Sequence, residues 1–335
     1  MDHLAQDLKQ MGLNSGGGAI RTRVQRTRGL QLIARELRAL GHVLPSARSI
    51  KDIHIQKLVA KWTDDGLATG TIKNRVSWMR TWSRNVRKGS VIPKSNADLG
   101  IELRATFKGN RAEATRLAQY ASLNERDQLA VRLQMAFGMR VEESILFEPE
   151  TAVQGDALHM KASWCKGGRA RVIPITHERQ RELLDELRTF VGTRCLVPEG
   201  MKSVVYRRQL DRRTWAAGIR DKHKHRHWYA QWRYRKLTGQ ECTAAGGKPF
   251  EQMTAAERRA DYRARQTITR ELGHERRQIT DAYLGYRFAR RQGLHEASPE
   301  LSSGGPAGDH SRKPRSPGGD LVRPGRAAGE NAGGS

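Results

Sequence analysis

A His-Lys-His-Arg-His run in the second half of the chain holds its densest group of side chains able to move protons or bind anions. His223 and Arg226 are three residues apart, so a helix would place them on one face, one turn apart. They would then offer a proton acceptor beside a planar pair of N–H donors for a phosphate. In a strand, His223, His225 and His227 would instead share a face and could bind a metal ion. The following residues look helical, and no cysteine or carboxylate lies at a familiar ligand spacing, so we expect no metal site.

Two further segments have a basic residue close to a glycine in the sequence. Gly138 predicts the end of a helix, and Arg140 lies just before a new helix that includes Glu143. An arginine held by a glutamate three residues on is ordinary structural chemistry. Lys166 precedes two glycines in a predicted hairpin turn, from which its ammonium could protonate or stabilise a leaving oxygen. Each segment is weak evidence by itself, because most turn lysines have no such role.

The last two segments are a Leu-Gly-His run that ends at His274 and a stretch that contains Tyr283. A lone Leu-Gly-His is common, and a helical tyrosine usually packs half-buried. As a nucleophile Tyr283 would be weak at neutral pH, because a free phenol has a pKa of about 10. It would need a proton acceptor, for which His223 is the candidate.

Together, the five segments resemble the active-site motifs of the tyrosine recombinases, the phage-integrase superfamily. Gly-Met-Arg-Val-Glu-Glu looks like that family's Gly-Leu-Arg-x-x-Glu box, and Lys-Gly-Gly-Arg-x-Arg-Val-Ile-Pro looks like its Lys-Gly-Gly hairpin. The resemblance covers roughly residues 120 to 290, and the helical pattern before it is similar to the family's core-binding domain. The matching residues occur in the family's order: Arg140, Lys166, His223-x-x-Arg226, Leu272-Gly273-His274 and Tyr283.

The resemblance implies strand transfer by transesterification. Tyr283 would attack phosphorus to give a 3′-phosphotyrosine and a free 5′-hydroxyl, with His223 accepting the tyrosine proton and Lys166 protonating the departing oxygen. The phosphotyrosine conserves the bond energy, so we expect no ATP site, and the chain has no Gly-x-x-x-x-Gly-Lys-[Ser/Thr] run. Tyr286 is a rival nucleophile, although the nine-residue spacing from His274 favours Tyr283.

The remaining motif residues would act on the phosphate oxygens. Arg140 and Arg226 would stabilise the charge that develops on the non-bridging oxygens, as a metal ion does elsewhere, so we expect no metal or other cofactor. His274 would donate a hydrogen bond to a phosphate oxygen and help to position the tyrosine. Glu143 would orient Arg140 or His223.

This resemblance favours a site-specific recombinase, the integrase of a mobile genetic element. Its partner would be double-stranded DNA with a specific attachment or crossover site, bound as a homotetramer, with accessory DNA-bending proteins as further partners. A type IB topoisomerase would use the same residues without choosing a site. A DNA-binding regulator with an inactive site is the alternative from a different class.

The first third of the chain must supply the DNA-binding helices. Residues 1–19 end in a Ser-Gly-Gly-Gly run and predict a flexible arm. Three apolar stripes follow, the third capped by Thr69: Leu30, Ile33, Leu37 and Leu40; Ile55, Leu58, Val59 and Trp62; Ile72, Val76, Met79 and Val86. The third stripe has no acidic residue between positions 71 and 88, and its basic residues predict a DNA-facing helix: Lys73, Arg75, Arg80, Arg84, Arg87 and Lys88.

We therefore expect a mainly helical protein with a small antiparallel β-sheet. Residues 20–105 would form a helical core-binding domain with its linker, and residues 106–292 the catalytic domain. Two strands, 157–164 and 169–175, would flank the turn at Lys166. Residues 293–335 are rich in glycine and proline and predict a disordered tail.

One departure from the family concerns length. His274 lies 48 residues after Arg226, more than the family usually allows. The excess, around residues 246–249 and 255–265, predicts a polar insertion.

Composition agrees with a nucleic-acid partner. The chain has 335 residues, with 61 Lys and Arg against 35 Asp and Glu, a formal net charge of +26. Each phosphate that a cation neutralises releases counterions and adds affinity whatever the base sequence. Composition alone leaves open a generally basic protein without such a partner.

Location follows from what the sequence lacks. No run approaches the roughly 18 apolar residues of a membrane span, and the first residues lack the apolar core of a secretory signal. The three cysteines, Cys165, Cys195 and Cys242, are widely spaced and predict reduced thiols. We expect a cytoplasmic protein, associated with the nucleoid when bound to DNA, with no membrane partner.

Overall fold

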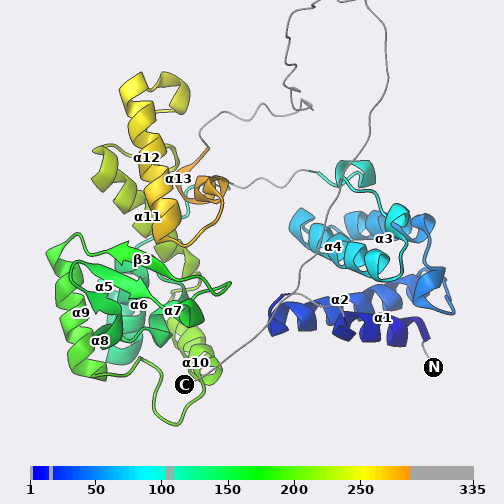
Figure 1. The fold of residues 1–335 in the computed structure, drawn as a ribbon, viewed down its shortest axis with the longest axis horizontal. Coiled ribbons are helices and arrows are strands. Elements are labelled where there is room, and N and C mark those ends of the chain that lie inside the picture. The colour runs from blue at the N-terminus through cyan, green and yellow to red at the C-terminus, as the bar shows by residue number, and fades with distance from the viewer. Residues whose placement is uncertain (1–2, 15–17, 103–106, 108, 287–335) are drawn as a thin grey trace, which may run out of the picture. The chain divides into compact units, whose positions relative to one another are not determined.

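The computed structural model describes residues 3–14, 18–102, 107 and 109–286, and the predicted tail lies outside them (Figure 1). In this part of the chain the fold is mainly helical, with one three-stranded antiparallel sheet. The predicted fold class is thereby confirmed. No helix in the described ranges has the length and apolar character needed to cross a membrane.

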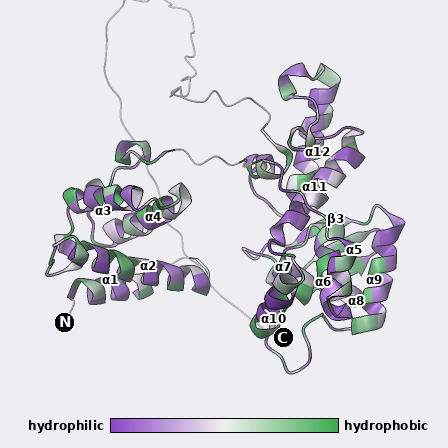
Figure 2. Ribbon diagram, turned by 180° about the vertical axis from the view of Figure 1, so that it is seen from behind, coloured by the Kyte–Doolittle hydropathy of each residue, from purple (hydrophilic) through white to green (hydrophobic). Residues whose placement is uncertain are grey.

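Four helices build the N-terminal hydrophobic core: α1 (His3–Asn14), α2 (Ile20–Ala39), α3 (Asp52–Asp64) and α4 (Thr69–Asn85). The predicted stripes line this core, and all of their members except Leu40 are buried. The helices alternate hydrophobic and hydrophilic residues along their length, as amphipathic helices do (Figure 2). Thr69 is not the predicted cap but the first residue of α4, and Ala68 stands at the N-cap position.

Helix α1 corrects the prediction of a flexible arm over residues 1–19. Leu4 and Leu8 are one helical turn apart and are both buried in the N-terminal core. Gly12 allows α1 to approach α2 closely, because a Cβ at this position would lie 2.5 Å from Oγ1 of Thr27. The glycine run dominated the sequence pattern, and two leucines in a polar segment gave too short a stripe to outweigh it.

The segment after α4 remains attached to the same core as far as Ile101. It contains two 3-10 helices, η2 (Gly89–Val91) and η3 (Ala97–Leu99), and a third, η1 (Ala47–Ser49), precedes α3. Ile92 and Ile101 are buried among the N-terminal helices. The first part of the predicted linker is therefore part of the folded unit.

A second hydrophobic core is formed by the helices that follow. They are α5 (Leu117–Ala121), α6 (Glu125–Phe137), α7 (Val141–Leu146), α8 (Pro149–Ala152), α9 (Glu178–Val191), α10 (Ser203–Ala216), α11 (His223–Thr238), α12 (Ala255–Glu271) and α13 (Asp281–Leu284). Asn124 caps α6, its side chain accepting a hydrogen bond from the Asp127 amide. Gly138 ends α6 in the left-handed conformation, with φ of 61°.

The sheet has the order β1-β2-β3, with strands Val153–Gln154, Ala157–Met160 and Arg171–Pro174. Leu158 pairs with Ile173 and Met160 with Arg171. The predicted strand 157–164 was too long, because the chain turns into a 3-10 helix, η4 (Ala162–Trp164). This turn buries Trp164, whose ring lies 5.9 Å from that of Phe147.

Helices α11 and α12 pack antiparallel, with contacts from Arg226 to Leu272 at one end and from Tyr234 to Asp261 nearer the other. Their connection, which holds η5 (Thr243–Ala245) and η6 (Phe250–Gln252), lies at the end remote from His223, about 24 Å along the 16-residue α11. Residues 255–265, which were predicted to belong to a polar insertion, form the first part of α12. Three of them, Asp261, Ala264 and Arg265, are buried.

Candidate active site

Tyr283 lies between two imidazoles. Its hydroxyl oxygen is 3.2 Å from Nε2 of His223 and 3.3 Å from Nε2 of His274. His223 is the first residue of α11, His274 follows the end of α12, and Tyr283 is in α13. The antiparallel packing of α11 and α12 thus brings together residues that are far apart in the sequence.

The rival tyrosine has a different environment. The Tyr286 hydroxyl accepts a hydrogen bond of 2.9 Å from the Phe107 amide, and the two rings meet edge to face with centroids 5.9 Å apart. The structure therefore brings Tyr283, and not Tyr286, to the histidines.

Both histidines beside Tyr283 are neutral at neutral pH. Burial, followed by the nearby Arg226 guanidinium, lowers the pKa of His223 to about 4. The same two causes lower the pKa of His274 to about 3. Each ring then has one nitrogen that can accept a proton or a hydrogen bond.

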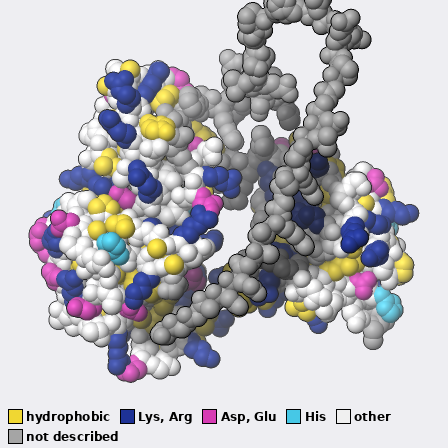
Figure 3. Space-filling model, viewed as in Figure 1, with side chains coloured by type: hydrophobic (Ala, Val, Ile, Leu, Met, Phe, Trp, Pro, Cys, Tyr) yellow, Lys and Arg dark blue, Asp and Glu magenta, His cyan; other side chains and the backbone are white. Residues whose placement is uncertain are grey.

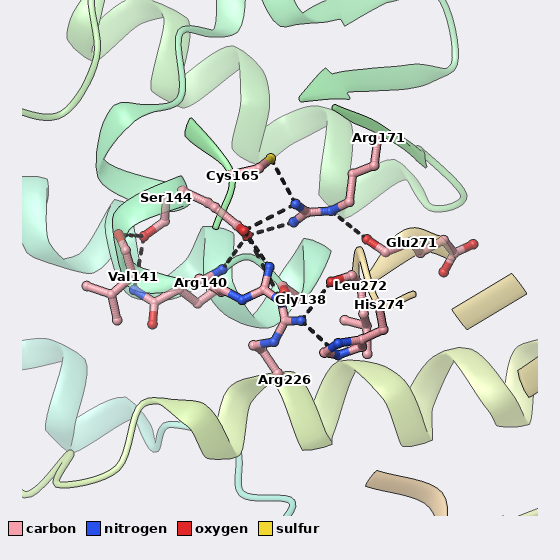
Figure 4. A network of polar contacts seen from close by, with 12 residues as sticks. Gly138, Arg140, Val141, Ser144, Cys165, Arg171, Arg226, Glu271, Leu272 and His274 are labelled. Carbon is pink, nitrogen blue, oxygen red and sulfur yellow. Dashed lines mark hydrogen bonds and ion pairs between the residues drawn. The ribbon is translucent and has the colours of Figure 1, made fainter. Parts of the chain in front are cut away.

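Arg226 is fully buried and is fixed by backbone carbonyl groups (Figure 4). Its Nη1 donates to the carbonyl oxygen of Gly138, and its Nη2 donates to that of Leu272 at 2.9 Å. Nη2 also lies 3.4 Å from Nε2 of His274. Its Nε is buried and has no hydrogen-bond partner among the described residues. The N–H at Nε therefore remains for another acceptor.

Arg140 and Glu143 form the next part of the site. Arg140 stands at the N-cap of α7, as predicted, and its amide donates to Oε2 of Glu143 at 2.7 Å. Its Nη1 donates to Oε1 of the same carboxylate at 2.6 Å, while its side chain keeps 22% of its surface exposed. Arg140 is thus held by its backbone amide and by Nη1, and the rest of its guanidinium is open to a ligand.

Glu143 has no exposed surface, yet it is ionised. Burial alone would raise the pKa of Glu143, but hydrogen bonds and charge from Arg171, followed by the charges of Arg140 and Arg226, outweigh it and lower the pKa to about 2. The predicted orientation of Arg140 by Glu143 matches the hydrogen bonds of this pair.

Two residues near the site were not predicted to belong to it. Arg171 donates two hydrogen bonds to Glu143, of 2.6 and 3.1 Å. The ring of His227 packs on that of Tyr283 with centroids 4.6 Å apart. The sequence carried a signal for Arg171, because it alternates with Ile173 on the buried face of β3.

The helical start of α11 separates the three histidines that a strand would have placed on one face. His223 and His227 lie beside Tyr283, whereas Nε2 of His225 is 2.8 Å from Oγ1 of Thr115. Within the described ranges, no group of three or more His, Cys, Asp or Glu side chains could hold a metal ion.

Comparison with known proteins gives a family for the first domain and a fold for the chain. Residues 1–89 match the model of a family described as phage integrase, N-terminal. A lambda integrase dimer bound to a COC′ core site is similar, with 16% identity and a TM-score of 0.58 over 89% of this chain and 80% of that chain. The Tn1549 transposon integrase in complex with circular intermediate DNA is similar, with 13% identity and a TM-score of 0.52 over 84% and 95%. The chain has the tyrosine recombinase fold.

A third solved structure agrees. The XerH site-specific recombinase bound to its difH substrate has 15% identity and a TM-score of 0.50, over 83% of this chain and 80% of that one. No curated protein matches the sequence. The resemblance seen in the motifs is confirmed by the tyrosine recombinase fold and by the family match of the first 89 residues.

Lys166 is one motif residue that the structure leaves outside the cluster. It is exposed on the turn after Cys165, where Gly167 and Gly168 have φ of 85° and 68°. No hydrogen bond or ion pair in the described part of the recombinase fold joins it to Tyr283 or the arginines. The expected role of Lys166 as a proton donor stays a prediction.

The predicted DNA-facing residues, which lie on α4 or just after its end at Asn85, fall into two groups. Arg75 pairs with Glu36 at 2.7 Å, and Arg80 donates to the carbonyl oxygen of Pro93 at 2.9 Å, so both hold their own domain together. Lys88 likewise donates to the carbonyl oxygen of Arg48, whereas Lys73, Arg84 and Arg87 are partly or fully exposed. On the visible face of the recombinase fold, Lys and Arg side chains are spread widely (Figure 3).

Proposed function

We propose that this protein is a site-specific DNA recombinase, an integrase that cuts and rejoins DNA through a 3′-phosphotyrosine at Tyr283. The observation that carries the proposal is the position of the Tyr283 hydroxyl, 3.2 and 3.3 Å from two neutral imidazoles. The fold supports it, because DNA was bound in the lambda integrase, Tn1549 integrase and XerH structures.

The first step forms a bond between the Tyr283 oxygen and phosphorus and breaks the bond from phosphorus to the 5′ oxygen. His223 takes the phenol proton as attack proceeds, which its neutral state allows. Lys166 supplies a proton to the departing 5′ oxygen. The reverse attack by a 5′-hydroxyl of a second DNA end reseals the strand without an energy source.

Charge on the phosphate is stabilised by Arg140 and Arg226. Arg140 offers the donors that Glu143 leaves free, and Arg226 offers its unpaired Nε. Both are held by other hydrogen bonds before DNA arrives, so little reorganisation is needed in the transition state. His274 contacts the tyrosine and adds a hydrogen bond to a phosphate oxygen.

The DNA partner and the assembly follow from the same proposal. The N-terminal unit from α1 to Ile101 forms the core-binding domain, the helices from α5 to α13 form the catalytic domain, and four copies act together on a specific crossover site. A lambda integrase tetramer was bound to a Holliday junction, which supports a tetramer here. The Tn1549 enzyme is a transposon integrase, which supports a mobile genetic element as the setting, in the cytoplasm, with DNA-bending proteins as accessory partners.

Covalent capture tests the reaction. The protein is mixed in chelator with DNA from both flanks of its own gene, and SDS-resistant adducts are sought for wild type, Tyr283→Phe and Tyr286→Phe. We expect an adduct that only Tyr283→Phe abolishes. Tight binding without any adduct would instead favour a DNA-binding regulator. Adduct formation and relaxation without exchange between two sites would favour a topoisomerase.

A further inference from the structure

The Glu143 carboxylate forms ion pairs with three guanidinium groups, those of Arg140, Arg171 and Arg226, and Arg171 holds it most completely. Figure 4 labels the three arginines. Arg171 donates from Nη2 to Oε2 at 2.6 Å and from Nη1 to Oε1 at 3.1 Å. Arg140 donates from Nη1 to Oε1 at 2.6 Å, and Nη1 of Arg226 lies 3.9 Å from Oε2. The two-pronged contact fixes the plane of the carboxylate, which a single contact cannot do.

Arg171 is itself fixed by other contacts. Its Nε donates to the carbonyl oxygen of Glu271 at 2.8 Å, and its Nη1 lies 3.1 Å from Sγ of Cys165. It also packs against the turn before His274, since a Cβ at Gly273 would lie 3.0 Å from Cδ of Arg171. Its side chain has only 5% of its surface exposed. Arg171 is thus fixed within the protein, because protein acceptors occupy all three of its nitrogens.

We propose that Arg171 is a positioning residue, which sets the place of the Arg140 guanidinium by holding the Glu143 carboxylate between them. This inference rests on the proposed function, because its effect appears at the scissile phosphate. Without Arg171, the buried carboxylate loses two donors and recruits further donors from Arg140. Those are the donors that would otherwise bind the phosphate.

A guanidinium is required at this position. Arg171 uses all three of its nitrogens, toward the carboxylate, the thiol and the backbone carbonyl. A lysine has one nitrogen on a flexible stem and cannot hold both carboxylate oxygens in one plane. Arg171→Lys therefore keeps the buried positive charge and loses the geometry.

The test compares two scissile groups in the same DNA. One duplex carries the natural phosphodiester, and the other a methylphosphonate, in which a methyl group replaces one charged non-bridging oxygen. The neutral group has less need of a guanidinium. We expect Arg140→Met to lose about 100-fold or more in the rate of adduct formation on the phosphodiester and much less on the methylphosphonate. Arg171→Met should change the ratio of the two rates in the same direction, by about 10-fold or more.

A matched control is available in Arg213. It makes a similar two-pronged contact, through Nε and Nη2, to Asp127, which is as fully buried as Glu143. Arg213→Met should lower stability without changing the ratio of rates. If Arg171→Met does not fold, Arg171→Lys is measured in its place and should shift the ratio in the same way.

The outcomes separate the two proposals. Equal losses on both duplexes for the Arg171 variants, as for Arg213→Met, would mean that Arg171 only stabilises the fold and would overturn the inference. Absence of any adduct with wild type on the phosphodiester would overturn the proposed function itself. A shifted ratio for both Arg140 and Arg171 variants supports both.

Discussion

The imidazole of His227 packs on the ring of Tyr283 at 4.6 Å between centroids, yet its Nδ1 is buried with no hydrogen-bond partner among the described residues. Burial lowers the pKa of His227 to about 4, so the ring is neutral. The contact acts through shape: it limits where the tyrosine ring can lie, and with it the hydroxyl between His223 and His274.

This contact predicts how substitutions at His227 behave. His227→Ala removes the packed ring and should slow adduct formation by about 10-fold or more, because a small displacement of a nucleophile strongly lowers its rate. His227→Phe keeps a flat ring and should remain close to wild type. Single-turnover adduct rates check this. If the phenylalanine variant is as slow as the alanine variant, the imidazole takes part in the chemistry.

Acid should destabilise the second hydrophobic core and the helices α5 to α13 around it. His223, His225 and His227 have pKa values of about 4 in the folded protein and His274 about 3, with burial as the first cause in each case. Unfolded histidine has a pKa of about 6.5, so between pH 6.5 and about 4 the unfolded chain binds more protons, and stability falls as pH falls. Glu143, with a pKa of about 2, stays ionised throughout this window.

Melting temperatures at pH 7, 6, 5 and 4.5 measure this effect. His225→Gln keeps a polar partner for Thr115 and removes one of the four protonation sites, so its melting temperature should depend less on pH. A melting temperature that is constant between pH 7 and 5 would contradict the lowered pKa values.

If His223 is the proton acceptor that we propose, His223→Gln should slow adduct formation by about 100-fold. In wild type the rate should change little from neutral pH to about 5 and fall as pH approaches 4, where His223 becomes protonated. The control for acid unfolding is His225→Gln, because the ring of His225 faces Thr115 and not Tyr283. If His223→Gln reacts at the wild-type rate, a group other than His223 must accept the tyrosine proton.

Apart from Arg140 and Arg226, which we propose to bind the phosphate, Arg265 should be one of the residues that contribute most to stability. It is fully buried and pairs with Asp261 at 2.8 Å and with Asp281 at 3.0 Å, joining α12 to α13. Arg265→Met would leave Asp261 buried with less compensation and should lower the free energy of unfolding by about 3 kcal/mol or more. Urea denaturation measures the change. An ion pair on the surface contributes up to about 1 kcal/mol. A loss smaller than that would contradict the importance of Arg265 for stability.

The sequence predicted those parts of the structure that depend on local pattern. The stripes of α2, α3 and α4, the helix end at Gly138 and the start of a helix after Arg140 all follow from periodicity or from a glycine. Helix α1 was missed because its burial depends on α2, which a local pattern does not contain. The early end of β2 was missed because Trp164 turns toward Phe147, a tertiary contact.

The candidate site shows the same division. Motif order selected the residues that surround Tyr283, whereas Arg171 and His227 act through contacts that only the folded chain reveals. Lys166 was selected with the others, but no pattern shows how far an exposed turn lies from the site.

The antiparallel pair of α11 and α12 places its connection at the end remote from Arg226 and His274, whose side chains are 3.4 Å apart. The number of residues between these two positions therefore has little influence on how they meet. A search that fixes this number would reject the chain, whereas a search for an arginine near the start of one helix and a histidine just after the end of its partner would retain it. Helical turns could be added to both helices together without changing how Arg226 and His274 meet at the other end.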